Sequence, residues 1–121
     1  MSLSDRLDEM RAGIAGCSLV SFGDLQTSLA LRTSSAAPCP RERLDEMFAR
    51  AVAGFAAADR LAAEAEPVSD LFVLTPSDVR VFVRSLRNAA DVVCAVGETA
   101  DEIGTMTARA KLILDDAERT R

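Results

Sequence analysis

The sequence of 121 residues lacks histidine, tryptophan and tyrosine entirely. Without histidine the chain cannot form a Ser-His-Asp or Cys-His catalytic arrangement, and it lacks the commonest general base and a ligand of most zinc sites. It also contains neither a phosphate loop of the G-x-x-x-x-G-K-[ST] type nor a G-x-G-x-x-G motif. These absences predict a protein that is not an enzyme and that holds no cofactor or metal.

Lysine is almost absent as well, because Lys111 is the only one, and the formal net charge is -5. Binding to nucleic acid or to an anionic membrane surface needs a surplus of positive charge, so the sequence argues against both partners. We find no signal-peptide pattern and no apolar run of membrane-spanning length. The cysteines Cys17, Cys39 and Cys94 are an odd number with no close pair, so we expect a cytoplasmic protein with reduced thiols.

Hydrophobic residues are abundant, at 49% of the chain, although only five of them are aromatic. This composition is sufficient for an aliphatic, alanine-rich core. The length favours one domain, which we expect to cover residues 1–121.

The region from Leu71 to Ala117 has the clearest pattern. It contains three short β runs, LFVLT, VRVFVRSL and VVCAV, separated by the turn sequences PSD and RNAAD. They lead into a helical segment that opens with Thr99 and Glu102 at the spacing of a capping box. The pattern predicts an antiparallel meander followed by a helix.

The N-terminal part predicts a helix, a hairpin and a second helix. Their expected ranges are about 4–15 for the first helix, 17–22 and 27–34 for the strands, and Pro40 to about Glu64 for the second helix. The complete order is α-β-β-α-β-β-β-α. We therefore predict an α+β fold with a five-stranded antiparallel sheet flanked by helices.

The second helix has two apolar stripes. A wide stripe of larger residues, with Phe48, Phe55 and Leu61 among them, predicts the core-facing side. The other consists of Ala49, Ala53 and Ala57, four residues apart. Either these alanines reflect a strong helix former in the alanine- and arginine-rich composition of a GC-rich, bacterial genome, or they allow another helix to approach closely. That second helix could belong to another subunit.

Charged side chains give weaker signals. Four adjacent acidic pairs, Asp8-Glu9, Asp45-Glu46, Asp101-Glu102 and Asp115-Asp116, lie on predicted helices. Neighbours on a helix point in different directions, so we interpret these pairs as helix-start and solvent-facing charges. Arg80, Arg84 and Arg87 lie on or just past one predicted strand, either as ordinary surface arginines or as a basic strip for an acidic partner. Cys39 lies between two prolines and has no visible base that would activate it.

Four segments resemble the roadblock family, named for roadblock-type dynein light chains. They are GCSLVSFGD at 16–24, the alanine-rich second helix, VLTPSDVRVFVR at 73–84, and VVCAVGETADEIG at 92–104. In the last of these a strand passes into a helix with a glycine after its first turn. The resemblance covers nearly the whole chain and is to the bacterial branch of the family.

The resemblance implies a sheet between two helical layers and a homodimer or heterodimer in which the third strands pair edge to edge and the second helices pack together. It also implies a noncatalytic regulatory or adaptor module, often one that acts on a Ras-like small GTPase. One bacterial branch stimulates a polarity GTPase without supplying an arginine finger. On this chain the implied dimer interface consists of Ala49, Ala53, Ala57, Leu71, Val73 and Thr75.

A different class of function stays open at this point. A small-molecule-sensing domain of profilin-like or PAS/GAF-like type also has a central antiparallel sheet flanked by helices. Such a domain needs a pocket lined by polar or aromatic groups, and the lack of tryptophan, tyrosine and histidine weakens this alternative.

Overall fold

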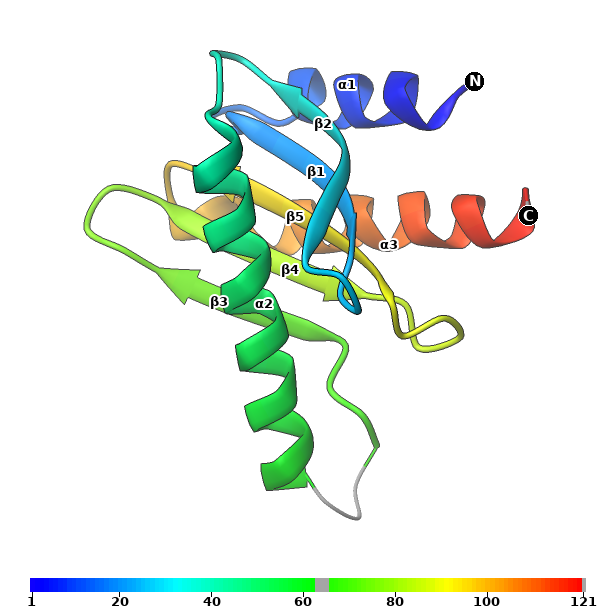
Figure 1. Cartoon of the computed structure of the whole chain (residues 1–121). Coiled ribbons are helices and arrows are strands. Elements are labelled where there is room, and N and C mark those ends of the chain that lie inside the picture. Colours follow the sequence, from blue (N-terminus) through cyan, green and yellow to red (C-terminus); the bar gives the residue numbers. More distant parts are fainter. Residues whose placement is uncertain (63–65, 121) are drawn as a thin grey trace.

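The computed structural model describes residues 1–62 and 66–120, and its elements follow the predicted order (Figure 1). The elements are α1 (Leu3–Gly13), β1 (Leu19–Asp24), β2 (Leu29–Ser35), α2 (Arg41–Ala62), β3 (Asp70–Leu74), β4 (Val79–Arg84), β5 (Asp91–Gly97), the 3-10 turn η1 (Ala100–Glu102) and α3 (Ile103–Arg119). The α+β fold class predicted from the sequence is confirmed.

The five strands form one antiparallel sheet in the order β2-β1-β5-β4-β3. β5 is buried at every position, as its continuous apolar run indicates for a central strand covered on both faces. β2 and β3 are the two edge strands.

Helices cover both faces of this sheet. α1 packs over β2 and β1, and α3 packs over β4 and β5, on the same face. α2 lies on the opposite face and crosses the strands, in front of the sheet in Figure 1. Each face has its own core. The α1/α3 side includes Leu7, Met10, Phe22, Val81, Val93 and Met106, and the α2 side includes Met47, Phe48, Phe55, Phe82, Val92 and Cys94.

Gly23 allows α2 to lie close to β1. A Cβ atom at this position would be 2.3 Å from Cε1 of Phe48 and 2.7 Å from the backbone oxygen of Leu29. Both separations are far below van der Waals contact, so a larger side chain would displace the helix or the hairpin.

The start of the last helix differs from the prediction. Thr99 makes no side-chain capping bond, and the chain first forms the 3-10 turn η1 before α3 begins at Ile103. The tighter turn replaces the α-helical first turn that a capping box requires, so the predicted Thr99–Glu102 capping box is wrong. A capping box does form at α1, where the backbone N–H of Asp5 donates to Ser2 Oγ at 3.1 Å and that of Ser2 donates to Asp5 Oδ2 at 3.2 Å.

Several other boundaries differ by a few residues, since α1 ends at Gly13 and β2 begins at Leu29. Cys17 precedes β1 and does not lie within it, although its side chain is buried. α2 ends at Ala62 in the described residues, and the predicted end at Glu64 lies outside them.

Candidate self-association and partner interface

β3 is an open edge with a regular backbone. The N–H of Arg84 donates to the oxygen of Ser69, and the N–H of Thr75 donates to the oxygen of Asp78, both at 2.9 Å. Hydrogen-bonded pairs alternate along an antiparallel ladder, so Leu71 and Val73 direct their backbone groups to β4. The backbone groups of the three residues between them face outward. These residues are Asp70, Phe72 and Leu74.

From Leu71 to Leu74 the side chains of β3 are apolar on both faces. Leu71 and Val73 are half-buried and pack against the α2-side core. Phe72 pairs with Val81, which belongs to the α1/α3-side core, so Phe72 and Leu74 lie on that other face. They are 48% and 64% exposed. A regular, apolar edge strand of this kind is a template for pairing with another chain.

α2 passes directly over β3 and continues beyond it. A Cβ atom on Gly54 would lie 2.7 Å from Cδ1 of Leu71, so the absence of a side chain at Gly54 permits this crossing. From Gly54 to the end of the helix at Ala62 the rise is about 12 Å. In Figure 1 the last turns of α2 project past the edge of the sheet.

The alanine stripe lies on the outer side of α2. Ala49 and Ala53 are exposed and Ala57 is half-buried. Leu61 is 89% exposed, so its predicted place in the core-facing stripe is wrong. Leu61 is in the last turn of α2, which ends at Ala62, and the last turns of this helix project past the edge of the sheet in Figure 1.

Arg84 attaches the C-terminal half of α2 to the sheet. Its guanidinium donates to both carboxylate oxygens of Asp59, at 3.0 and 2.5 Å, and to the backbone oxygen of Val68 at 2.7 Å. Its Cζ atom lies 4.5 Å from the centre of the Phe55 ring. The hydrogen bonds from Arg84 hold the pKa of Asp59 below its ordinary value. Arg84 is only 8% exposed, so it joins α2, β4 and the segment before β3.

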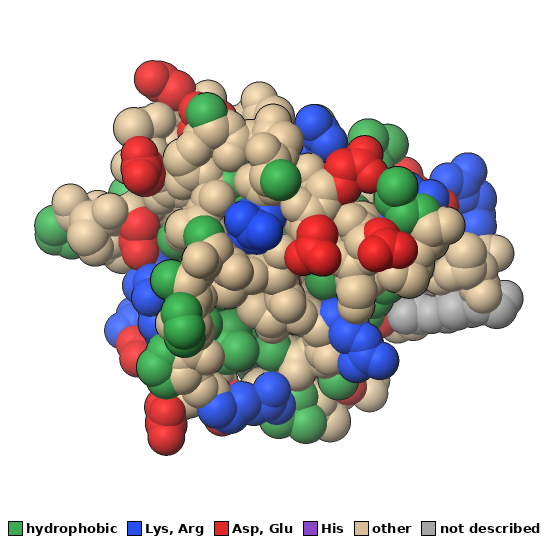
Figure 2. Space-filling view, turned by 90° about the horizontal axis from the view of Figure 1, so that it is seen from above, with side chains coloured by type: hydrophobic (Ala, Val, Ile, Leu, Met, Phe, Trp, Pro, Cys, Tyr) green, Lys and Arg blue, Asp and Glu red, His purple; other side chains and the backbone are tan. Residues whose placement is uncertain are grey.

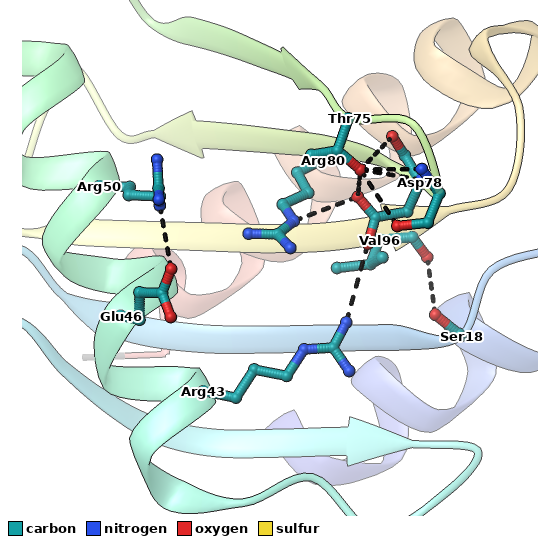
Figure 3. Close-up of polar contacts among 9 residues, drawn as sticks. Ser18, Arg43, Glu46, Arg50, Thr75, Asp78, Arg80 and Val96 are labelled. Atoms are coloured by element: carbon teal, nitrogen blue, oxygen red, sulfur yellow. Dashed lines mark hydrogen bonds and ion pairs between the residues drawn. The ribbon is translucent and has the colours of Figure 1, made fainter.

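Thr75 and Arg80 belong to a polar network at the β3–β4 turn (Figure 3). The carboxylate of Asp78 accepts hydrogen bonds from the Thr75 hydroxyl at 2.8 Å and from Arg80 Nε at 3.2 Å. It also forms an ion pair with Arg43 of α2 at 3.7 Å. The Thr75 hydroxyl accepts the backbone N–H of Asp78 at 3.0 Å, so this side chain organises the turn.

The three arginines suggested by the sequence do not form one strip. Arg80 lies beside α2 in the turn network, and Arg84 is buried under the same helix. Arg87 is exposed in the β4–β5 loop. It lines a surface hollow of about 260 Å³ together with Lys111, Leu114 and other residues of α3. Arg87 is the most exposed of the three, while the Arg80 side chain is 17% exposed and bonded to Asp78.

The chemistry of the remaining candidates is limited. Burial raises the pKa of the Cys94 thiol, and also that of Cys17, which keeps both in the unreactive protonated form. Among the residues that the structure describes, no group of three or more potential ligands could hold a metal ion. Within the same residues, no helix has both the length and the apolar character needed to span a membrane.

Comparisons of the sequence find no matching family model and no matching curated protein. Comparison of the structure gives a different result. A roadblock/LC7 domain from Streptomyces avermitilis superposes with a TM-score of 0.78 at 9% identity, covering 99% of this chain and 98% of that one. The chain has the roadblock fold. Myxococcus xanthus MglB is also similar, with a TM-score of 0.75, 12% identity, and coverage of 98% and 93%. A structure of MglB with a tetrameric arrangement gives a TM-score of 0.77, 15% identity, and coverage of 98% and 90%.

These identities are low, so the roadblock likeness rests on the arrangement of the backbone. The sequence pattern predicts β3 and α2 but does not single out all the residues that define their surfaces. Phe72 and Leu74 carry a detectable signal, because Leu71-Phe72-Val73-Leu74 is apolar at consecutive positions and so must expose one apolar face if it is an edge strand. The pairing of Arg84 with Asp59 spans 25 residues and has no local signal.

Proposed function

We propose that this roadblock-fold chain is a noncatalytic regulatory or adaptor module that acts as a homodimer. The observation that carries the proposal is the open β3 edge, which combines a regular backbone with exposed apolar side chains. Antiparallel pairing of two β3 strands would join two five-stranded sheets into one and would satisfy the outward backbone groups of Asp70, Phe72 and Leu74.

The position of α2 supports the same assembly. In a dimer joined at β3, the turns of α2 that project past the sheet would lie over the partner's sheet (Figure 1). The two α2 helices would then run side by side across the seam. Small residues favour a close contact between them. The interface we propose therefore comprises Ala49, Ala53, Ala57, Leu71, Val73 and Thr75 together with Gly54 and Phe72.

Self-association also agrees with the similar structures, since one of them is an MglB in a tetrameric arrangement. The first experiment is sedimentation equilibrium of the purified chain. A molar mass twice that of one chain is expected, and a monomer at high micromolar concentration would contradict the proposal.

We extend the proposal to a Ras-like small GTPase as the partner, in a cytoplasmic setting. The support for this partner is the roadblock fold and the sequence resemblance to a family of small-GTPase regulators. Arg80 and Arg87 are the candidate contacts. The test is a pull-down from native lysate with excess GTP analogue or GDP, analysed by mass spectrometry. Recovery of a small GTPase in one nucleotide state is expected, and recovery of no GTPase in either state would remove this part of the proposal.

A further inference from the structure

We infer that the β3 seam of the proposed dimer forms, on the α1/α3 face, a slot for one amphipathic helix of a partner protein. This inference rests on the proposed dimer and adds a binding surface that neither chain has alone. It follows from the spacing of the helices on this face and from the side chains that β3 leaves uncovered.

Each helix on the α1/α3 face covers two strands. α1 lies over β2 and β1, and α3 lies over β5 and β4. Adjacent strands are about 4.8 Å apart, so helices two strands apart have axes about 10 Å apart, which matches ordinary helix packing. The two helices are indeed in contact, with an ion pair of 2.5 Å between Arg6 and Asp116. The fifth strand, β3, has no described helix over it on this face (Figure 1).

Pairing of two β3 strands would place side by side two strands that no described helix covers on this face, between the α3 helices of the two chains. The α3 helices of the two chains would then be four strand spacings apart, which is about 19 Å. A helix midway between them would lie about 10 Å from each, and this is again the normal packing distance. The seam is wide enough for one helix and too narrow for two.

The floor of this slot is apolar at Phe72 and Leu74, while Asp70, which lies on the same face of β3, is ion-paired with Lys111 of α3. Phe72 and Leu74 of each chain would lie side by side across the seam, with their outer surfaces uncovered because α3 lies over β4 and β5. Edge-to-edge pairing covers the backbone of β3 but leaves these side chains facing outward from the sheet. Four large apolar side chains in one channel form the kind of patch that marks an interaction site.

The walls come from the side of α3 that faces β3. Lys111 Nζ lies 3.3 Å from Asp70 Oδ2, which identifies this side. Thr107 and Gly104 share it, because they are four and seven residues before Lys111. A Cβ atom on Gly104 would meet nothing within 4 Å, so this wall opens onto free space beside the floor.

These features define the chemistry of the occupant. Its apolar stripe would contact Phe72 and Leu74, and its flanks would meet the polar wall residues. Two paired β3 strands of five residues are about 16 Å long, which corresponds to about three turns of helix. Because the slot lies on the two-fold axis, one helix would bind per dimer.

The test uses a displayed library of 14-residue helices with varied apolar residues at one face, selected against the purified chain. The selected peptides are then measured by calorimetry against the wild type, Gly104→Arg and Thr105→Arg. Gly104→Arg places a long side chain in the slot without touching the seam. Thr105→Arg places the same side chain on the neighbouring exposed position, which faces away from β3.

We expect a stoichiometry of one peptide per two chains, at least tenfold weaker binding to Gly104→Arg, and less than a twofold change for Thr105→Arg. All three proteins should remain dimers in sedimentation. One peptide per chain, equal binding to both variants, or no selected helix would overturn the slot while leaving the dimer intact. Dimers that associate with each other through the slot, in a way that Gly104→Arg abolishes, would replace the partner helix with a second copy. A monomeric wild type would overturn the proposed function itself.

Discussion

The two edge strands of the sheet expose similar amounts of apolar side chain but differ in their backbones. β2 exposes Leu29 and Leu31, at 41% and 48%, while β3 exposes Phe72 and Leu74. β2 pairs with β1 through a register shift, in which Phe22 faces Arg32 and Gly23 faces Ala30, so that Leu31 has no partner. β3 pairs with β4 without any shift. Only β3 therefore offers a straight row of donors and acceptors, because irregularities of this kind protect an edge.

The side chains around the two edges reinforce this contrast. The guanidinium of Arg32 donates to the backbone oxygen of Leu31 at 2.9 Å, so a charged group stands beside the irregular part of β2. Figure 2 looks down on the β2 side of the molecule, where acidic and basic groups are intermixed over the surface. On β3 the residues from Leu71 to Leu74 carry no charge. Exposed hydrophobic area alone therefore does not distinguish the two edges, whereas the regularity of the backbone does.

A proline in β3 should have the largest effect on dimerisation. Phe72→Pro removes an outward N–H of β3 and leaves the intramolecular ladder with β4 intact. We expect dimer dissociation to rise by about 100-fold or more, equivalent to about 3 kcal/mol. The matched control is Thr33→Pro on β2. The N–H of Ala36 donates to the oxygen of Ser18, and hydrogen-bonded pairs alternate along the β1–β2 ladder, so the N–H of Thr33 points away from β1. Sedimentation equilibrium checks both, and equal effects of the two prolines would contradict the assignment of β3.

Arg84→Ala should have the next largest effect, on the anchoring of α2 beside β3. It removes three partly buried hydrogen bonds and the contact with Phe55. We expect the free energy of unfolding to fall by about 2 to 3 kcal/mol, measured by urea denaturation. Arg87→Ala, in the exposed β4–β5 loop, is the control and should change it by less than about 0.5 kcal/mol. A similar stability for both variants would show that the Arg84 contacts do not hold α2.

Ala53→Glu tests the helix part of the interface. A charge in a close contact between two α2 helices should weaken dimerisation by about 10-fold, because the carboxylate would lose water without gaining a partner. Ala12→Glu on α1, the helix that covers the β2 edge, adds the same charge at another exposed alanine and should leave dimerisation unchanged. Unchanged association of Ala53→Glu in analytical ultracentrifugation would exclude Ala53 from the interface.

The smallest expected effect is on pH dependence. Because Arg84 lowers the pKa of Asp59 in the folded state, the carboxylate contributes stability at pH values above its unfolded pKa, and this contribution is lost as the pH falls through the lowered folded pKa. Wild type should therefore be more stable than Asp59→Asn at pH 7, and the difference should shrink below about pH 4. Urea midpoints at pH 7 and pH 3 measure this, and a constant difference would argue against the ion pair.

Sequence periodicity was sufficient to predict the element order, because the β runs from Leu71 to Val96 are short, apolar and separated by turn residues. It could not show the register shift at Leu31 or the position of Leu61, since both depend on where the strands end and on how far α2 extends. The hydroxyl of Thr99 had the right spacing for a cap, but this spacing does not distinguish an α-helical first turn from the 3-10 turn that forms. Arg84 looked like a surface residue because its partner, Asp59, belongs to a distant helix.

The contact between Gly23 and Phe48 has a consequence for the divergence of this chain. A methyl group at position 23 would overlap both the Phe48 ring and the backbone oxygen of Leu29. A smaller residue at position 48 would remove only the overlap with the ring, so substitutions at positions 23 and 48 are not independent. In an alignment of orthologues, glycine at 23 should be retained wherever 48 is aromatic. A larger residue at 23 should occur only together with a smaller residue at 48 and a hairpin of altered length between 24 and 29.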